Sequence, residues 1–180
     1  MSRQLPEIIR THTLAKTRLF CIEQMGLRFS NGVEVEYERL VSRSHGAVMV
    51  VPMLDDDTVL LIREYAAGVQ RYELALPKGR LEAGESIEQG ANREIREEIG
   101  YAARQLRHLT SLTLAPGYLS HVTQVVLAQD LYQDRAQGDE PEEIEVVPWR
   151  LSRLGELMQH EECTEARSIA ALFLVREMLI

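Results

Sequence analysis

The segment from Gly79 to Tyr101, GRLEAGESIEQGANREIREEIGY, constrains the fold more than any other part of this sequence. It predicts a helix over residues 86–99. Ser86 and Gln89 are spaced as a capping box, the pattern that satisfies the free backbone N–H groups at a helix start. Gly100 is placed to end the helix in the left-handed conformation that glycine adopts without strain. The segment therefore predicts one well-delimited, Glu-rich helix.

Three carboxylates share one face of this predicted helix. Glu94 precedes Glu97 by three residues and Glu98 by four, and residues at those spacings are neighbours on a helix surface. Like charges so placed repel, by about 0.2–0.5 kcal/mol per solvated pair, so their grouping favours a bound cation. Carboxylate oxygens suit Mg²⁺ or Mn²⁺, which also bind substrate phosphates. The alternative is a solvated helix held by ion pairs such as Arg93–Glu97.

The spacing of the whole segment decides between these interpretations. Seven positions follow the pattern Gly-x5-Glu-x7-Arg-Glu-apolar-x-Glu-Glu-x-Gly: Gly79, Glu85, Arg93, Glu94, Glu97, Glu98 and Gly100. With a frequency of roughly 10% for each residue type, chance gives this pattern in roughly 10⁻⁷ of registers. An ordinary solvated helix is therefore rejected. The segment resembles the Nudix box, with Tyr101 in place of the usual aliphatic residue.

The resemblance to the Nudix family implies an α+β fold, a Nudix α/β/α sandwich with a mixed sheet. We expect residues 45–180 to form this domain and residues 1–44 to form an N-terminal β extension. Within the extension, weakly alternating residues 19–41 predict a β-hairpin or short meander, with a type I′ turn at Asn31-Gly32. Similar enzymes are homodimers built partly through their N-terminal strands, so the resemblance implies a homodimer.

The remaining elements follow from apolar patterning. Residues 47–54 and 58–62 are apolar, β-branched runs joined by three aspartates, and they predict a buried hairpin with a solvated acidic turn. Helical spacing of apolar residues over 169–180 predicts a C-terminal helix. Cys21 and Cys163 match no metal-binding spacing and are expected to be free thiols.

The resemblance also implies the site. One to three Mg²⁺ ions would be held by the carboxylates of the box and a main-chain carbonyl at Lys78 or Gly79, so the implied metal ligands are Gly79, Glu94, Glu97 and Glu98. Glu85 and Arg93 would pair to brace the loop against the helix, with Gly100 structural. Clustered metals neutralise the pyrophosphate and lower the pKa of a bound water, so Glu97 and Glu98 count as catalytic.

A general base is expected outside the box. In similar enzymes it is a Glu of a mobile loop, and the acidic stretch 139–143 occupies the corresponding place. We favour Glu142 over Glu140 and Glu143. A plain solvated loop is the alternative interpretation of this stretch.

The substrate class comes from resemblance beyond the box. Residues 61–66, 115–118 and 165–177 look like the ADP-ribose pyrophosphatase branch of the family. This implies ADP-ribose, the diadenosine polyphosphate Ap3A and NADH as substrates, each yielding AMP and a second phosphorylated product. Ala75 stands where many ADP-ribose enzymes have Glu, which favours a broader range of ADP-linked compounds. The alternatives are a nucleotide sugar or other nucleoside diphosphate derivative, or a non-catalytic nucleotide sensor.

Substrate contacts outside the box are predicted at three positions. Arg63 and Arg71 flank the strand that enters the box and could bind phosphates through charge-assisted hydrogen bonds. Tyr118 could stack on adenine or ribose. The alternatives are surface arginines at strand ends and a tyrosine packed on its own strand.

Charge and hydropathy exclude other classes of partner. A net charge of −8 argues against a nucleic-acid groove, which needs many Lys and Arg on one face. No stretch approaches the ~20 apolar residues that span a bilayer, so no membrane partner is expected. Residues 1–19 lack the continuous apolar core of a signal peptide, and we expect a cytoplasmic protein.

Overall fold

A computed structural model describes residues 4–42 and 46–179. These residues form two compact units, described separately below. The N-terminal unit contains residues 4–42 and 113–122, and the C-terminal unit contains residues 46–112 and 123–179. The sequence-based boundary at residues 44 and 45 stays a prediction.

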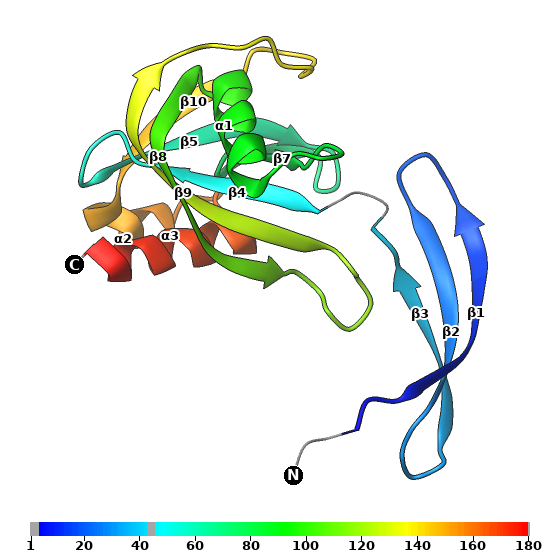
Figure 1. Ribbon diagram of the computed structural model, residues 1–180. Helices are drawn as coiled ribbons and strands as arrows, with labels where there is room; N and C mark the ends of the chain where they lie inside the picture. Colours follow the sequence, from blue (N-terminus) through cyan, green and yellow to red (C-terminus); the bar gives the residue numbers. More distant parts are fainter. Residues whose placement is uncertain (1–3, 43–45, 180) are drawn as a thin grey trace. The chain divides into compact units, whose positions relative to one another are not determined.

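The N-terminal unit is built on a three-stranded antiparallel meander (Figure 1). Its strands are β1 (Glu7–Lys16), β2 (Cys21–Arg28) and β3 (Glu34–Leu40), in the order β1-β2-β3. The predicted β-hairpin or meander is thus present, but β1 lies before the residues expected to form it. Most side chains of β1 and β3 are exposed.

The turn between β2 and β3 differs from the predicted type I′ turn. That turn needs positive φ at both central residues, whereas here Gly32 has φ +83° and Asn31 is not among the residues with positive φ. The Phe29 carbonyl accepts a hydrogen bond from Gly32 N–H, and Phe29 N–H donates to the Val33 carbonyl (both 2.9 Å). The loop therefore holds three residues and ends on a left-handed glycine, because a three-residue loop needs only one such position.

The C-terminal unit contains two sheets and the helices that cover them. One sheet has the order β7-β4-β9-β8 and the other has the order β10-β5-β6. Strand β4 pairs in parallel with β9 and antiparallel with β7, so the first sheet is mixed. The elements are β4 (Ala47–Pro52), β5 (Thr58–Ala66), β6 (Arg71–Ala75), β7 (Lys78–Arg80), α1 (Ile87–Glu98), β8 (Tyr101–Thr113), β9 (Val122–Gln133), β10 (Glu145–Arg150), a 3₁₀ turn (Leu151–Arg153), α2 (Leu154–Leu157) and α3 (Ala166–Leu179).

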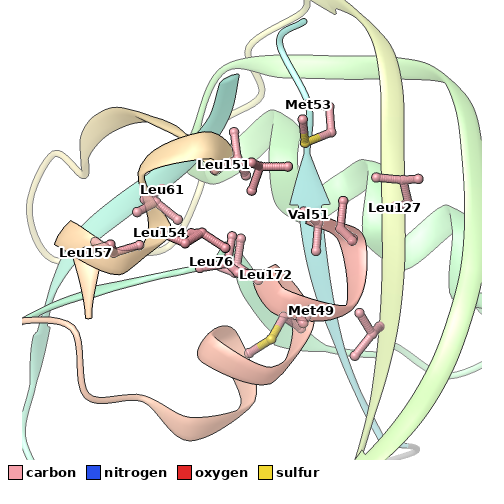
Figure 2. Close-up of a cluster of buried hydrophobic side chains, with 14 of the residues drawn as sticks. Met49, Val51, Met53, Leu61, Leu76, Leu127, Leu151, Leu154, Leu157 and Leu172 are labelled. Atoms are coloured by element: carbon pink, nitrogen blue, oxygen red, sulfur yellow. The ribbon is translucent and has the colours of Figure 1, made fainter. Parts of the chain in front are cut away.

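Alternating side chains of β4 divide the core into two layers. Met49 and Val51 pack in the cluster that includes residues of α2 and α3 (Figure 2). Val48 and Val50 face the opposite cluster, which includes Ile95 of α1. These four residues of β4 are fully buried, so the strand is apolar on both faces. With α1 on one side and α2 and α3 on the other (Figure 1), these layers match the predicted α/β/α sandwich.

The predicted hairpin of β4 and β5 is wrong, because the two strands belong to different sheets. Where the chain turns, the two runs are linked by an isolated bridge between Met53 and Val59 and by a hydrogen bond from Leu54 N–H to Thr58 O (2.8 Å). The acidic turn is held locally, since Asp55 accepts the N–H groups of Asp57 (2.9 Å) and Thr58 (2.7 Å). Asp57 accepts hydrogen bonds from Ser152 N–H and O–H (both 2.8 Å). Asp55 and Asp57 therefore stabilise the turn in which the chain passes from the sheet of β4 to the sheet of β5.

The helices are close to the sequence prediction at their start and end. Ser86 caps α1, and its hydroxyl accepts from Gln89 N–H in a complete capping box. Gly100 follows with φ +76°. Helix α3 is the predicted C-terminal helix, and α2 was not predicted. Across residues 4–42 and 46–179, no helix has the length and hydropathy needed to cross a membrane.

Candidate active site

Helix α1 presents three of its four glutamates, Glu94, Glu97 and Glu98, to the protein interior and to a cleft. Glu94 and Glu98 are 6% and 4% exposed, and Glu97 is half-buried. Burial raises the pKa of Glu94 to about 7, with a further contribution from Glu97 and Glu140. Burial also raises the pKa of Glu98 to about 9, with Glu94 and Glu64 adding to it. A nearby cation favours the charged form of carboxylates whose pKa values are raised in this way.

Strand β7 fixes the position of Glu98. The Glu98 carboxylate oxygen Oε2 accepts a hydrogen bond from the main-chain N–H of Lys78, in β7, at 3.0 Å. The Lys78 ammonium donates to Glu64 of β5 at 2.9 Å and attracts Glu98, which lowers the pKa of that carboxyl against the effect of burial. The sequence indicated Lys78 only through its main-chain carbonyl, as a possible metal ligand, and gave no sign of Glu64, because no local spacing links β5 to the box.

Gly79 is a glycine because the Glu94 carboxylate lies against it. A methyl group built at Gly79 would overlap all three atoms of that carboxylate. Gly79 is not among the positive-φ glycines, so close approach, and not backbone conformation, excludes a side chain there. The first glycine of the motif therefore admits a buried carboxylate beside the backbone of β7.

The Gly79→Ala variant is expected to lose Mg²⁺ affinity, because the new methyl group displaces Glu94. Overpacking should also lower the free energy of unfolding by about 1–3 kcal/mol. Urea unfolding and a Mg²⁺ titration of the melting temperature measure both effects. The matched control is Gly155→Ala, where a methyl group meets nothing within 4 Å and the helical setting makes alanine neutral or slightly favourable. Equal behaviour of the two variants would contradict this role of Gly79.

Arg93 braces the loop before α1 against the helix. Its Nε donates to Glu85 Oε1 at 2.9 Å and its Nη2 to Glu85 Oε2 at 3.2 Å. Nη2 also bonds the carbonyl of Arg80 at 2.8 Å. The hydrogen bonds from Arg93 lower the pKa of Glu85. Gly90, which the sequence analysis did not single out, allows this packing because a methyl group there would meet Leu81 and Glu85.

The residues fit a hard divalent cation, although Arg93 presently bridges two of the carboxylates. Its Nη1 bonds Glu94 Oε1 at 2.9 Å and Glu97 Oε2 at 3.0 Å. In the part of the chain that the structure describes, no three acidic, His or Cys side chains already form a metal-ligating group. The buried carboxylates with raised pKa values are nonetheless oxygen donors of the kind Mg²⁺ prefers. Cation binding would exchange the Arg93 contacts for metal contacts.

The stability of the metal-free protein is expected to fall as the pH rises. The pKa values of Glu94 and Glu98 in the folded protein, about 7 and about 9, exceed the ordinary glutamate pKa of 4.5. Between pH 4.5 and 9 the folded state therefore binds more protons than the unfolded state, and it loses stability as those protons leave. Melting temperatures with EDTA and with Mg²⁺ at pH 6 and pH 8 test this, and Mg²⁺ should stabilise more at pH 8. The opposite order of the two Mg²⁺ effects would contradict the assignment.

A cleft of about 360 Å³ joins α1 to the loop before β10. Glu142 of this loop accepts a hydrogen bond from the Tyr72 hydroxyl of β6 at 2.9 Å. The carboxylate of Glu140 lies over Gly138, where a side chain would overlap it. The lining residues are Glu97, Glu98, Arg135, Gly138, Glu140, Pro141, Glu142, Glu143 and Ile144. The structure thus places all three candidate bases in one cleft with Glu97 and Glu98.

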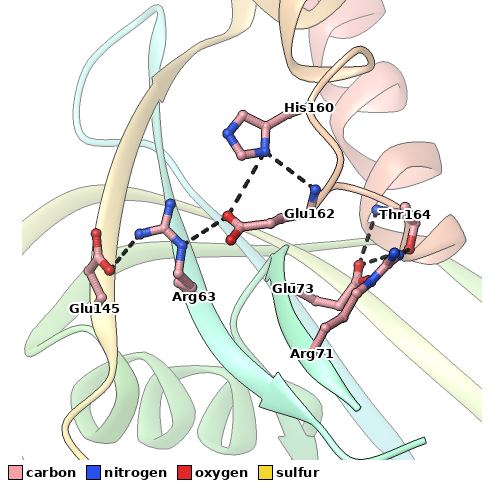
Figure 3. A network of polar contacts seen from close by, with 7 residues as sticks. All are labelled: Arg63, Arg71, Glu73, Glu145, His160, Glu162 and Thr164. Atoms are coloured by element: carbon pink, nitrogen blue, oxygen red, sulfur yellow. Dashed lines mark hydrogen bonds and ion pairs between the residues drawn. The ribbon is translucent and has the colours of Figure 1, made fainter. Parts of the chain in front are cut away.

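The two arginines among the predicted substrate contacts, Arg63 and Arg71, are bound to other side chains of the protein (Figure 3). Arg63 bonds Glu145 at 2.5 Å and Glu162 at 3.0 Å. A phosphate at Arg63 would have to displace one of these carboxylates, and its role stays a prediction.

The other two predicted contacts also stay predictions. Arg71 donates to Glu73 at 2.6 Å and to Thr164 at 2.9 Å, as Figure 3 shows. Tyr118 belongs to the N-terminal unit, where it is 60% exposed and its carbonyl accepts Leu40 N–H at 2.7 Å. Neither side chain has a contact that identifies a substrate group.

Comparison with known families gives two adjoining matches. The model described as the NUDIX domain matches residues 43–173. The model described as the NudE-type Nudix hydrolase N-terminal domain matches residues 6–39. Together they cover β1, β2, all of β3 except Leu40, and all the site residues described above.

Comparison with individual proteins agrees. ADP compounds hydrolase NudE of Escherichia coli is 46% identical over 178 residues, which cover 99% of this chain and 95% of that protein. ADP-ribose pyrophosphatase of Bacillus subtilis is 28% identical over 166 residues, covering 89% of each chain. A crystal structure of an ADP compounds hydrolase superposes with a TM-score of 0.91 at 46% identity, covering 99% of this chain and 96% of that one. The predicted resemblance and fold class are confirmed.

Proposed function

The chain belongs to the Nudix hydrolase family, and from that premise we propose that it cleaves the pyrophosphate bond of ADP-linked compounds with the help of Mg²⁺. The observation that carries this proposal is the 46% identity to an ADP compounds hydrolase over 99% of the chain. The expected substrates are ADP-ribose, Ap3A and NADH. Water adds to one phosphorus while the bridging P–O bond breaks, which yields AMP and a second phosphorylated product.

The geometry of α1 and β7 supports a role in holding the metal. Glu94, Glu97 and Glu98 would bind one to three ions, assisted by the carbonyl of Gly79. When bound, a divalent cation supplies positive charge at the pyrophosphate and makes a bound water more acidic. Nudix hydrolases generally use a divalent metal, and carboxylate ligands favour Mg²⁺ or Mn²⁺ among such ions.

We assign the other residues of the site to two roles, which are positioning of the loop and helix and deprotonation of the attacking water. Glu85 and Arg93 hold the loop and helix in register through their two hydrogen bonds. Glu142 is proposed to take the proton of the attacking water, since it lines the same cleft as Glu97 and Glu98. A carboxylate positioned in this way contributes about 10²–10⁴-fold as a general base.

A substrate panel tests the proposed activity. The protein is incubated with Mg²⁺ and ADP-ribose, Ap3A, NADH, nucleotide sugars or nucleoside triphosphates, and the products are separated by chromatography. AMP from the ADP-linked compounds at the highest kcat/KM supports the proposal, and EDTA should abolish it. Preference for a nucleotide sugar would overturn the substrate class. Tight nucleotide binding without any cleavage would indicate a sensing module instead.

We also propose that the protein is a homodimer, with the meander of β1, β2 and β3 at the interface. Apolar side chains on this sheet are exposed, including Ile8 (57%), Leu14 (50%) and Tyr37 (43%). Exposed apolar patches of this kind mark interaction surfaces. Sedimentation should give a mass near twice 20.5 kDa. A stable monomer would contradict the proposal.

A further inference from the structure

Tyr72 lies where β6 meets the acidic loop. It faces Tyr65 directly across the β5–β6 pair, and the two rings meet edge-on with centroids 5.7 Å apart at an interplanar angle of 69°. Such edge-to-face aromatic contacts stabilise a fixed ring orientation. The Tyr72 ring is therefore supported by its strand partner and points its hydroxyl toward the loop.

The hydroxyl anchors one oxygen of Glu142. Tyr72 O–H donates to Glu142 Oε1 at 2.9 Å. A hydrogen bond from a neutral donor to a carboxylate is shorter and stronger than one between neutral groups. The other oxygen, Oε2, receives no hydrogen bond from any residue of 4–42 or 46–179. One oxygen is thus held by β6 while the other is available to accept a proton.

The anchored position of Glu142 is one that faces the site. With the bond to Tyr72 formed, Glu142 lines the cleft together with Glu97 and Glu98. Neither Glu140 nor Glu143 has a comparable bond to a strand residue among those described. Tyr72 therefore distinguishes Glu142 from its two neighbours by tying it to the rigid β5–β6 pair.

We propose that Tyr72 is a positioning residue that holds the loop base Glu142 in its working orientation through the O–H···Oε1 bond. This inference rests on the proposed function, because it assigns Glu142 a proton-accepting role. Loss of the bond leaves the loop free to rotate the carboxylate away from the attacking water. Misplacement of a catalytic group lowers the rate of the chemical step without weakening substrate binding.

The test compares Tyr72→Phe with Tyr65→Phe. Each variant removes one hydroxyl from the same aromatic pair, but only the Tyr72 hydroxyl bonds the loop. Tyr72→Phe should lower kcat roughly ten-fold, as loss of a supporting hydrogen bond typically does, with KM within two-fold of the wild type. Tyr65→Phe should leave kcat within two-fold. Equal loss in both variants, an unchanged Tyr72→Phe, a faster Tyr72→Phe or an effect on KM alone each overturns the proposal.

A double-mutant cycle shows whether Tyr72 acts through Glu142. Adding Tyr72→Phe to the Glu142→Gln variant should lower kcat by less than two-fold, because no base remains to be positioned. A second ten-fold loss in that background would show that Tyr72 acts on something else. Circular dichroism melts of every variant ensure that folded proteins are compared.

A measurement without turnover separates failure of this inference from failure of the proposed function. The bond to Glu142 raises the pKa of the Tyr72 hydroxyl. In a tyrosine titration followed by NMR, the Glu142→Gln variant should return this hydroxyl toward its ordinary pKa. If the wild type cleaves no ADP-linked compound, the proposed function fails while this result still decides the contact. If the wild type is active and the titration of Tyr72 is unchanged in Glu142→Gln, the positioning proposal fails alone.

Discussion

Replacing Glu98 by glutamine is expected to lower kcat by roughly 10³-fold while leaving the protein folded. That factor corresponds to about 4 kcal/mol of transition-state stabilisation, in the range attributed to metal-ion and electrostatic catalysis. Glutamine has the shape of glutamate and keeps an oxygen for the Lys78 N–H that now bonds Oε2 at 3.0 Å. It lacks the negative charge, so the substitution removes a metal ligand and little else.

The metal-free stability of the variant gives an independent readout. Burial raises the pKa of Glu98 to about 9, so at pH 8 the unfolded chain ionises this group while the metal-free folded state keeps it mostly protonated, and this difference lowers the stability of the wild type. The glutamine variant cannot ionise. It should therefore melt at the same or a higher temperature than the wild type in EDTA at pH 8, and gain less stability from Mg²⁺.

A matched control lies on the same helix. Glu88→Gln changes an exposed glutamate in the first turn of α1, outside the acidic face. Its kcat should stay within two-fold of the wild type. Steady-state kinetics over a range of Mg²⁺ concentrations measures both variants. If Glu98→Gln kept more than a tenth of the wild-type kcat at saturating Mg²⁺, the role of Glu98 as a metal ligand would be refuted.

Features that depend on neighbours in the chain were predictable from the sequence. The start and end of α1 follow from Ser86, Gln89 and Gly100, which act within one helical turn. The shared face of Glu94 and Glu98 follows from helix geometry alone. The structure adds that these two residues are the buried ones, because the face carrying them packs on β7.

Strand pairing was not predictable from local patterns. Strand β4 and residues 59–62 of β5 are apolar and buried on both faces, so their sequences carry no alternation that assigns a partner. The parallel partner of β4 is β9, which starts at Val122, far along the chain. A short acidic turn between two apolar runs looks like a hairpin connection even where the chain changes sheets.

The same limit applies to the polar contacts of the site. Lys78 with Glu64, and Tyr72 with Glu142, join residues 14 and 70 positions apart. A residue pattern over such separations contains no period that could indicate a bond. The sequence shows only that Lys78 lies beside the box and that Glu142 lies in the acidic loop. This makes each a candidate site residue but does not indicate its hydrogen-bond partner.

Substitution of the three loop glutamates by glutamine is expected to single out Glu142. The Glu142→Gln variant should lose at least ~10²-fold in kcat, because glutamine cannot take a proton from the attacking water. Its Mg²⁺ affinity should be retained, since the carboxylates of α1 are untouched. Metal affinity is measured by the Mg²⁺-dependent shift of the melting temperature, and kcat by AMP release.

The neighbouring glutamates provide the comparison. Glu143→Gln should stay within a few-fold of the wild type. Glu140→Gln should act mainly on metal binding, because the charge of Glu140 adds to the field that raises the pKa of Glu94. A loss of 10²-fold in Glu140→Gln alone would move the base to that residue. Near-normal kcat in all three variants would mean that no glutamate of this loop takes the proton from the attacking water.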